Sequence, residues 1–160
     1  MKRVLDASAL LTGRQFPGDL VTVPGVVREL QRHGMTSQLE AVLNIQVRIL
    51  SPGAEARERV RAASESSGDA YRLSPTDRDL LALAVELGAT LVTDDYSIQN
   101  LCRTLAVPYE PILTAGIKEV WTWSYRCTGC RQTWPEWHDE CPTCGARLKT
   151  ARPRVTRGRR

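Results

Sequence analysis

The sequence predicts an α/β protein in which a three-layer domain with a mostly parallel central sheet precedes a small C-terminal module. The first 115 residues alternate strand-like and helix-like patterns, as successive βαβ units do. Four of the five cysteines fall within the short span 127–144. Residues 1–115 carry 12 Lys/Arg against 14 Asp/Glu, whereas residues 116–160 carry 10 against 4. The balances of −2 and +6 indicate a slightly acidic body and a basic module that faces a polyanion.

Hydrophobic periodicity and turn residues define the expected elements of the first part. The predicted strands cover residues 3–5, 20–23, 47–50 and 89–93. The predicted helices cover residues 8–12, 26–32, 37–43, 54–67, 75–87 and 97–105. Ser74 and Pro75 favour a helix start, because Ser is a preferred N-cap and Pro is tolerated at the first helical position. Gly34 and Gly88 are typical of helix ends.

We divide the chain into a domain of residues 1–115, an extended connection of 116–125, a cysteine module of 126–148 and a basic tail of 149–160. The tail has no acidic residue and almost no large apolar side chain, so we expect it to be disordered. The sequence shows no apolar run long enough for a membrane span and no signal segment. We therefore expect a soluble protein of the cytoplasm, without a membrane partner.

The cysteine spacing predicts one structural Zn²⁺ site. Two Cys-x2-Cys pairs supply four thiolates for tetrahedral coordination, and they leave no open position for water: Cys127, Cys130, Cys141 and Cys144. The alternative is a pair of disulfides or free thiols, which suits an intracellular chain poorly. Cys102 lies in an apolar helical neighbourhood, which favours a buried structural thiol.

Acidic residues occur where strands end or helices begin. Asp6 and the pair Asp94-Asp95 follow strands, while Glu29 and Asp77 stand in the first turns of helices. The carboxyl ends of parallel strands and the adjoining helix starts form the ligand crevice of such sheets. Carboxylates gathered there repel one another, and a hard divalent cation relieves the repulsion. The sequence therefore predicts a second, catalytic metal site.

Each acidic residue also has a local explanation. Asp77 can complete a capping box with Ser74, and Asp79 can do so with Thr76. Glu29 can simply favour the helix dipole, and the Asp94-Asp95 pair can be a solvated loop. Only convergence of the whole set would select the metal site.

The acidic residues lie in segments that resemble the four motifs of PIN-domain nucleases: Leu5-Asp6-Ala7-Ser8, Val23-Pro24-Gly25 through Glu29, Leu73-Ser74-Pro75-Thr76-Asp77 and Leu91-Val92-Thr93-Asp94-Asp95. The resemblance implies a PIN-like fold and the catalytic tetrad Asp6, Glu29, Asp77 and Asp95. The family pattern of Thr, any residue, then Asp selects Asp95 over Asp94. It further implies one or two Mg²⁺ or Mn²⁺ ions held by Asp6, Asp77 and Asp95, with Asp94, Ser8 and Thr93 as auxiliary residues.

The addition of a four-cysteine ribbon to these motifs resembles the archaeal branch of the Nob family. That resemblance implies an endoribonuclease that forms the mature 3′ end of small-subunit ribosomal RNA by metal-activated water attack, leaving a 5′-phosphate and a 3′-hydroxyl. It implies as partners the precursor RNA, the pre-ribosomal particle and a KH-domain assembly factor. Two alternatives stay open: a VapC-like toxin ribonuclease and a non-catalytic, zinc-stabilised RNA-binding assembly factor.

Basic residues near the ribbon are expected to hold the RNA that the acidic site repels: Lys118, Arg126, Arg131, Arg147, Lys149, Arg152 and Arg154. Aromatic residues gather in the same region, and Trp121, Trp123 and Tyr125 would share one strand face by their spacing of two. Such rings can stack on unpaired bases or form the core of a small module.

Overall fold

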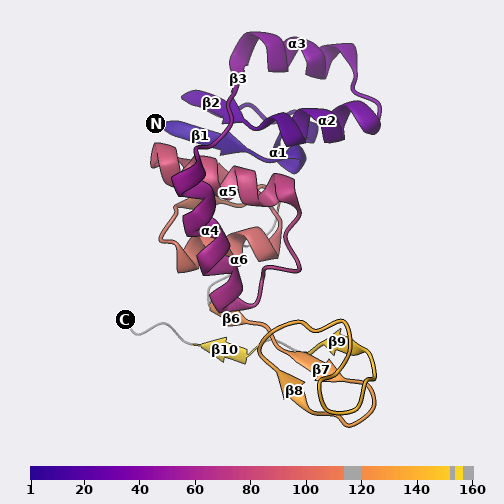
Figure 1. Ribbon diagram of the computed structural model, residues 1–160. Helices are drawn as coiled ribbons and strands as arrows, with labels where there is room; N and C mark the ends of the chain where they lie inside the picture. The colour runs from indigo at the N-terminus through magenta and orange to yellow at the C-terminus, as the bar shows by residue number, and fades with distance from the viewer. Residues whose placement is uncertain (114–119, 152–153, 157–160) are drawn as a thin grey trace.

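The computed structural model describes residues 1–113, 120–151 and 154–156. A fully parallel sheet forms the centre of the first part and runs in the order β3-β2-β1-β4-β5 (Figure 1). Its strands are β1 (Lys2–Leu5), β2 (Asp19–Thr22), β3 (Val47–Ile49), β4 (Thr90–Val92) and β5 (Tyr109–Glu110). The parallel sheet confirms the predicted fold class. Strand β5 was not predicted, because it has only two residues and stands between Pro108 and Pro111.

Helices join the strands at nearly the predicted positions: α1 (Ala7–Leu11), α2 (Pro24–Arg32), α3 (Ser37–Gln46), α4 (Ala54–Ser67), α5 (Pro75–Leu87) and α6 (Tyr96–Thr104). Helices α4, α5 and α6 pack together, and α5 also contacts β1 and β4. Leu5 and Leu20 line a cavity of about 300 Å³ with residues of α1 and α3. Val4, Val21 and Leu91 are register partners on β1, β2 and β4, so they point to the opposite face of the sheet, and they are fully buried. Helices therefore cover both faces of the sheet.

The strand order places a topological switch point between β1 and β4. The chain leaves β1 through α1 toward β2 on one side, whereas β4 lies on the other side of β1. At such a point the connecting loops diverge and open a crevice beyond the carboxyl ends of the strands. Asp6 directly follows β1, and Thr93 to Asp95 follow β4. The backbone N–H of Asp6 donates to the carbonyl of Val92, 3.2 Å away, so the two strand ends are joined at the crevice.

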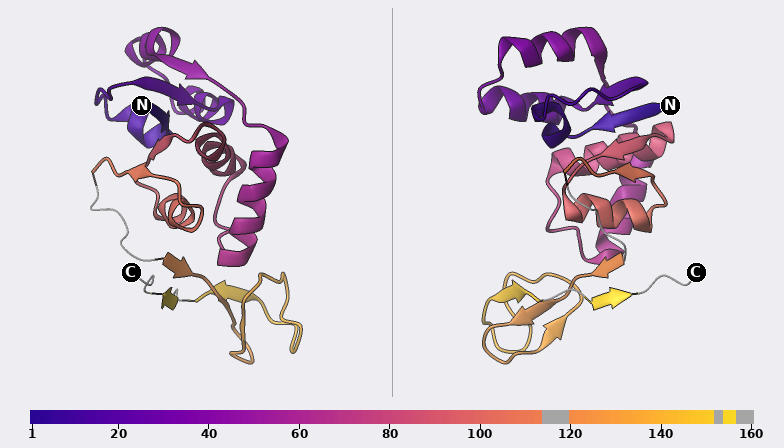
Figure 2. Two further views of the ribbon diagram at one scale, coloured as in Figure 1. Left: turned by 90° about the vertical axis from the view of Figure 1, so that its left-hand side faces the viewer. Right: turned by 180° about the vertical axis from the view of Figure 1, so that it is seen from behind.

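The C-terminal module is built from short antiparallel strands. Strand β7 (Tyr125–Cys127) lies between β8 (Thr133–Trp134) and β9 (Leu148–Thr150), while β6 (Val120–Thr122) pairs with β10 (Arg154–Thr156) (Figure 2). We call residues 125–150 the ribbon. Strand β10 corrects part of the expectation that residues 149–160 are disordered, because Arg154–Thr156 gains backbone hydrogen bonds from β6. Residues 152–153 and 157–160 of that tail lie outside the described residues.

Two separate apolar cores support these parts. The larger contains buried residues of β1 to β4 and of the helices around them, and Tyr109 of β5 packs against it. The smaller consists of Tyr125, Cys127, Cys141 and Leu148, with Trp134, Trp137 and Ala146 packed around them. In the part of the chain that the structure describes, no helix has the length and apolar character of a membrane span.

Candidate functional site

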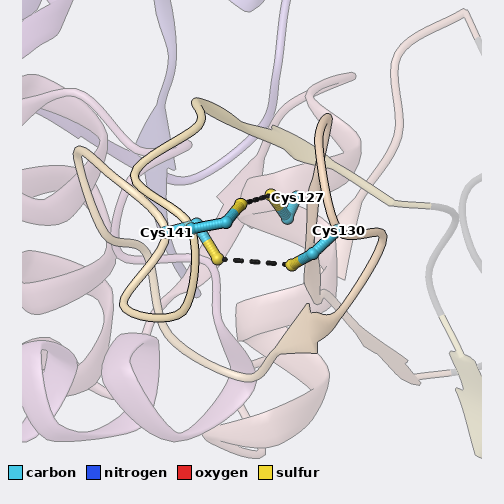
Figure 3. A group of neighbouring side chains, drawn as sticks. Cys127, Cys130 and Cys141 are labelled. Atoms are coloured by element: carbon cyan, nitrogen blue, oxygen red, sulfur yellow. Dashed lines mark hydrogen bonds between the residues drawn. The ribbon is translucent and has the colours of Figure 1, made fainter.

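The four predicted cysteines converge in the ribbon, and their Sγ atoms all lie within 4.8 Å of one another (Figure 3). The Sγ atoms of Cys127 and Cys144 are 3.4 Å apart, and those of Cys130 and Cys141 are 3.6 Å apart. These distances exceed a disulfide bond, which measures about 2.05 Å. They approach the sulfur–sulfur separation of about 3.8 Å that follows from tetrahedral Zn–S bonds of about 2.3 Å. The cluster therefore fits a tetrahedral metal ion such as Zn²⁺.

Backbone N–H groups donate to several of these sulfurs. The N–H of Gly129 donates to the Sγ of Cys127 at 3.3 Å. Burial alone would raise the pKa of Cys141, but hydrogen bonds from the backbone N–H groups of Thr143 and Cys144 and with neighbouring cysteine side chains outweigh it and lower the pKa to about 6.

The pKa of Cys144 is lowered as well, chiefly by the backbone N–H of Ala146. At Cys130 a backbone hydrogen bond at Gln132, which lowers the pKa, is outweighed by burial and the neighbouring cysteines, which raise it to about 12. Since the thiolate is the form that binds a metal, this environment prepares Cys141 and Cys144 in particular. Gly145 has a φ of +72°, which lets the second knuckle turn tightly.

A group of three carboxylates lies at the sheet crevice. Asp6 is the N-cap of α1, and its side chain accepts hydrogen bonds from the N–H of Ala7 at 2.6 Å, the hydroxyl of Ser8 at 3.2 Å and the hydroxyl of Thr93 at 2.7 Å. Burial raises the pKa of Asp6 despite these donors, and the charge of Asp95 raises it further. Asp6 is therefore a half-buried acid at the switch point, and it lies near the acid that follows β4.

Thr93 connects the two strand ends. Its side chain is fully buried, and its hydroxyl donates to Asp6 while accepting the backbone N–H of Asp95 at 3.1 Å. The carbonyl of Thr93 accepts a hydrogen bond from the amide group of Gln99, which is also fully buried. Thr93 therefore sets the relative positions of Asp6 and Asp95.

Asp95 and Asp77 approach the same crevice from two further helix starts. Asp95 is the N-cap of α6, and its Oδ1 accepts the N–H groups of Ser97 and Ile98. Asp77 forms a capping box with Ser74 at the start of α5. Burial raises the pKa of Asp77, and the charges of Asp6 and Asp95 add to the increase. The local explanation of Asp77 is thus confirmed, and the same carboxylate also belongs to the convergent group.

These three carboxylates are neighbours without forming a closed cage. Among the described residues, the cysteine cluster is the one group of three or more His, Cys, Asp or Glu whose ligand atoms all lie within 4.8 Å of one another. The acids therefore leave space between them. Unlike the sulfurs, they could share a cation only if part of its coordination came from water or substrate oxygens, as Mg²⁺ sites commonly do.

Glu29 lies on α2, on the side that approaches the start of α5. A Cβ atom at Gly25 would stand 2.5 Å from the hydroxyl of Thr76, so glycine allows the two helices to come together there. Glu29 is four residues beyond Gly25 and half-buried, and residues four apart share one face of a helix. Its place in the tetrad stays a prediction, since the charges that raise the pKa of Asp77 are those of Asp6 and Asp95.

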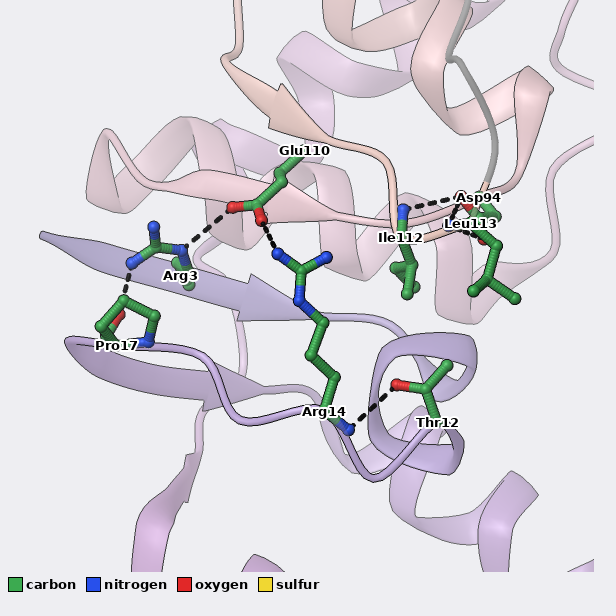
Figure 4. A network of polar contacts seen from close by, with 8 residues as sticks. All are labelled: Arg3, Thr12, Arg14, Pro17, Asp94, Glu110, Ile112 and Leu113. Carbon is green, nitrogen blue, oxygen red and sulfur yellow. Dashed lines mark hydrogen bonds and ion pairs between the residues drawn. The ribbon is translucent and has the colours of Figure 1, made fainter.

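The two other candidate acids are engaged elsewhere. The carboxylate of Asp94 accepts the backbone N–H groups of Ile112 and Leu113 and so fixes the segment that follows β5 (Figure 4). Asp79 faces α4, where it forms two hydrogen bonds with the guanidinium of Arg57. These contacts favour Asp95 over Asp94 as the acid that follows β4 in the crevice, as the family pattern implies.

Replacing Asp77 by Asn is expected to stabilise the protein by about 0.5–1 kcal/mol at pH 7.5 without added divalent cations. The raised pKa of Asp77 means that its ionised form costs folding free energy. Protonated Asp77 stabilises the wild type at pH values below the unfolded pKa, and this contribution is lost as the pH rises through the folded pKa. The advantage of the Asn variant should therefore shrink as the pH falls. Urea unfolding followed by helical circular dichroism measures it.

The matched control for this variant is Asp79→Asn, two residues further along α5. Asp79 loses a partly exposed ion pair with Arg57 rather than a repulsion, so the free energy of unfolding should stay within about 0.5 kcal/mol or decrease slightly. Equal stabilisation by both substitutions would contradict the crowding of negative charge at Asp77.

Comparisons with known proteins agree with this geometry. The family described as the PIN domain of ribonuclease matches residues 4–87. A protein of Methanothermobacter thermautotrophicus named Endoribonuclease Nob1 is 38% identical over 162 residues, covering 96% of this chain and 95% of the relative. The Endoribonuclease Nob1 of Pyrococcus abyssi is 36% identical, covering 93% and 92%. The Ribonuclease VapC1 of Thermoplasma acidophilum is also 36% identical, covering 91% of this chain and 76% of its own length.

Proposed function

Since this chain belongs to the Nob1 family of PIN-domain endoribonucleases, we propose that it cleaves precursor small-subunit ribosomal RNA to form the mature 3′ end. The observation that carries the proposal is the presence of two different centres in one chain. Three carboxylates converge at the switch point of a PIN domain, and a four-cysteine ribbon follows that domain. The first can cut a phosphodiester, while the second can hold RNA without taking part in the chemistry.

The acidic centre is suited to one or two Mg²⁺ or Mn²⁺ ions, with Asp6, Asp77 and Asp95 as the ligands. A hard cation bound there would supply an activated water and neutralise charge on the phosphate. Asp6 offers its carboxylate in the orientation that Thr93 and Ala7 impose, and Asp95 is oriented by the first turn of α6. Glu29 would complete the tetrad from α2, and Ser8 would position water or a phosphate oxygen.

The exposed face of the ribbon provides basic groups for RNA. Arg126 on β7 lies opposite Lys149 on β9, and both side chains are exposed. Arg131 and Arg147 are exposed on the adjoining loops. Cations in this arrangement bind phosphates without reading sequence. Arg154 is placed by its backbone in β10, while Lys118 and Arg152, which we also assign to RNA contact, lie outside the described residues.

The two alternatives differ from this proposal in substrate and chemistry. A VapC-like toxin would cut transfer or messenger RNA, and the similarity to a VapC1 ribonuclease supports this alternative. The more complete coverage of Nob1 relatives favours maturation of ribosomal RNA. A purely structural assembly factor would not need three crowded carboxylates, two of which, Asp6 and Asp77, have pKa values that burial raises. We propose a cytoplasmic enzyme that acts on the pre-ribosomal particle, with a KH-domain factor as a candidate partner.

Cleavage of a precursor RNA that spans the 3′ end of small-subunit ribosomal RNA tests the proposal. We expect cutting at one principal position that requires Mn²⁺ or Mg²⁺, with a 5′-phosphate and a 3′-hydroxyl on the products. Transfer and messenger RNA of similar length should be cut at least about tenfold more slowly, a difference of about 1.4 kcal/mol in transition-state stabilisation. Preferential cutting of transfer RNA, with growth arrest when the chain is expressed alone, would favour the toxin instead.

A further inference from the structure

The ribbon is seated on the end of α4 by backbone and aromatic contacts. The hydroxyl of Tyr125 donates to the carbonyl of Gly68 at 2.7 Å, and Tyr125 itself is fully buried. The backbone N–H of Trp123 donates to the carbonyl of Ser67 at 3.1 Å. The ring of Tyr71 approaches those of Tyr125 and Trp137, with centroids 6.1 and 6.0 Å away. The views in Figures 1 and 2 show the ribbon beyond this end of α4.

Charged side chains of the nuclease domain complete this contact. The guanidinium carbon of Arg72 lies 3.8 Å from the ring centroid of Trp123, the geometry of a cation–π contact. Asp69 is fully buried and accepts hydrogen bonds from the hydroxyl of Ser67 and the amide group of Asn100. Burial raises the pKa of Asp69, and the indole N–H of Trp123 is among the groups that lower it. A buried acid outside the nuclease centre thus links the end of α4 to α6, near Trp123.

The same residues lead to the nuclease centre. Arg72 donates through its Nε to the hydroxyl of Ser97, whose backbone N–H donates to Asp95 at 2.7 Å. The carbonyl of Asp69 accepts the N–H groups of Arg72 and Leu73, immediately before the helix that carries Asp77. Two of the three convergent carboxylates are therefore one or two contacts away from the seat of the ribbon.

We propose that these contacts form a rigid joint that fixes the ribbon relative to the nuclease centre and thereby determines where the bound RNA is cut. The joint consists of Ser67, Gly68, Asp69, Tyr71 and Arg72 on the nuclease side and Trp123 and Tyr125 on the ribbon side. Asp69 and Arg72 are positioning residues, because they act through Trp123 and Ser97 and not on the RNA. The consequence for cleavage rests on the proposed function, whereas the rigidity of the joint does not.

Gly68 is the position at which the joint is most sensitive. It is the C-cap of α4 with a φ of +77°, and a Cβ atom there would lie 2.9 Å from the carbonyl oxygen of Trp123 and 3.4 Å from its side chain. Gly88 is the C-cap of α5 with a φ of +56°, and a Cβ atom there would meet nothing within 4 Å. Alanine therefore strains the backbone at both helix ends, but it obstructs the ribbon only at Gly68.

The test compares Gly68→Ala with Gly88→Ala in the full, zinc-loaded chain. Amide ¹⁵N relaxation should give one correlation time for the nuclease domain and the ribbon in the parent and in Gly88→Ala, and a shorter time for the ribbon alone in Gly68→Ala. Affinity for the precursor RNA should fall about tenfold in Gly68→Ala, because an undocked ribbon loses its favourable effective concentration. Its cuts should spread from one principal position to several neighbouring ones. Trp123→Phe, which keeps a ring over Arg72, should retain more of the shared tumbling than Trp123→Leu.

A ribbon that tumbles with the nuclease domain in both Gly68→Ala and Trp123→Leu would overturn the joint. Independent tumbling in the parent would overturn it as well. Independent tumbling of the ribbon in Gly68→Ala with an unchanged cut position would refute the role in choosing the cut. Absence of cleavage by the parent would instead count against the proposed function, and the relaxation measurements would still decide whether the joint is rigid.

Discussion

Asp6→Asn is expected to lower the rate of RNA cleavage about a thousandfold, equivalent to about 4 kcal/mol of transition-state stabilisation. Asp6 is the half-buried carboxylate that directly follows β1 at the switch point, and the charge of Asp95 raises its pKa further. The substitution removes one negative charge from the centre that would hold the cation. The fold should survive, because the remaining oxygen of Asn can still accept the N–H of Ala7. Single-turnover cleavage at saturating Mn²⁺ measures the effect.

The loss of cation binding should be visible without RNA. Mn²⁺ at a hundred times its dissociation constant stabilises a protein by about 2.7 kcal/mol, so it should raise the melting temperature of the wild type but hardly that of Asp6→Asn. Asp95→Asn should behave like Asp6→Asn in both assays. Asp94→Asn should keep its cleavage rate within about tenfold, a loss of no more than about 1.4 kcal/mol, because its carboxylate holds the backbone of Ile112 and Leu113. If Asp94→Asn is the more damaging of the two, the choice of Asp95 is wrong.

The elements that could be predicted from the sequence are those with local causes. The start of α5 follows from the Ser74 cap, the proline at the first helical position and the acid at the third. The structure shows the reciprocal hydrogen bonds between the cap and this acid. The strands of the sheet interior follow from short apolar runs. The convergence of Asp6, Asp77 and Asp95 could be anticipated because parallel strands bring their carboxyl ends to one edge. This prediction needed only the topology of a parallel sheet and none of the individual side-chain contacts.

The features that escaped prediction depend on distant partners. Asp94 and Asp95 both follow β4, and the choice of Asp95 came from the family pattern alone; the contact that engages Asp94, with the backbone N–H of Ile112, could not be foreseen. Nothing around Asp69 marks it as buried, since its partner Asn100 is 31 residues away. Trp121, Trp123 and Tyr125, which were expected to share one strand face, do not lie on one strand. The strand is interrupted at Trp123, which crosses between β6 and β7 and packs on Arg72.

Removal of the Zn²⁺ ion that the cysteine cluster would bind is expected to unfold the ribbon while the nuclease domain stays folded. Structural Zn²⁺ contributes about 10 kcal/mol or more to small domains of this kind, and the core of the ribbon has only four buried residues, of which two are cysteines. Cys141→Ser replaces a buried ligand and should abolish stoichiometric zinc binding. Elemental analysis measures the zinc content, and two optical signals report on the two parts of the chain.

The optical signals separate because of where the chromophores lie. All four tryptophans fall within residues 121–137, so tryptophan fluorescence reports on the ribbon and the joint. The helices α1 to α6 belong to the nuclease domain, so circular dichroism at 222 nm reports on that domain. Cys141→Ser should shift the fluorescence to that of exposed indoles and leave the helical signal nearly unchanged. Loss of both signals together would mean that the two cores are not independent.

Cys102→Ala provides the matched control, because Cys102 is a fully buried thiol of the nuclease core. Burial raises the pKa of this thiol, and the thiol lies in the nuclease core, outside the cluster of four cysteines. Its variant should keep one zinc and native fluorescence, and should lose about 1–2 kcal/mol in the helical unfolding transition through the cavity left behind. Cys141→Ser should therefore change the fluorescence and the zinc content, whereas Cys102→Ala should change only the helical unfolding transition. That contrast assigns the metal to the ribbon and the thiol to the nuclease core by measurements independent of RNA cleavage.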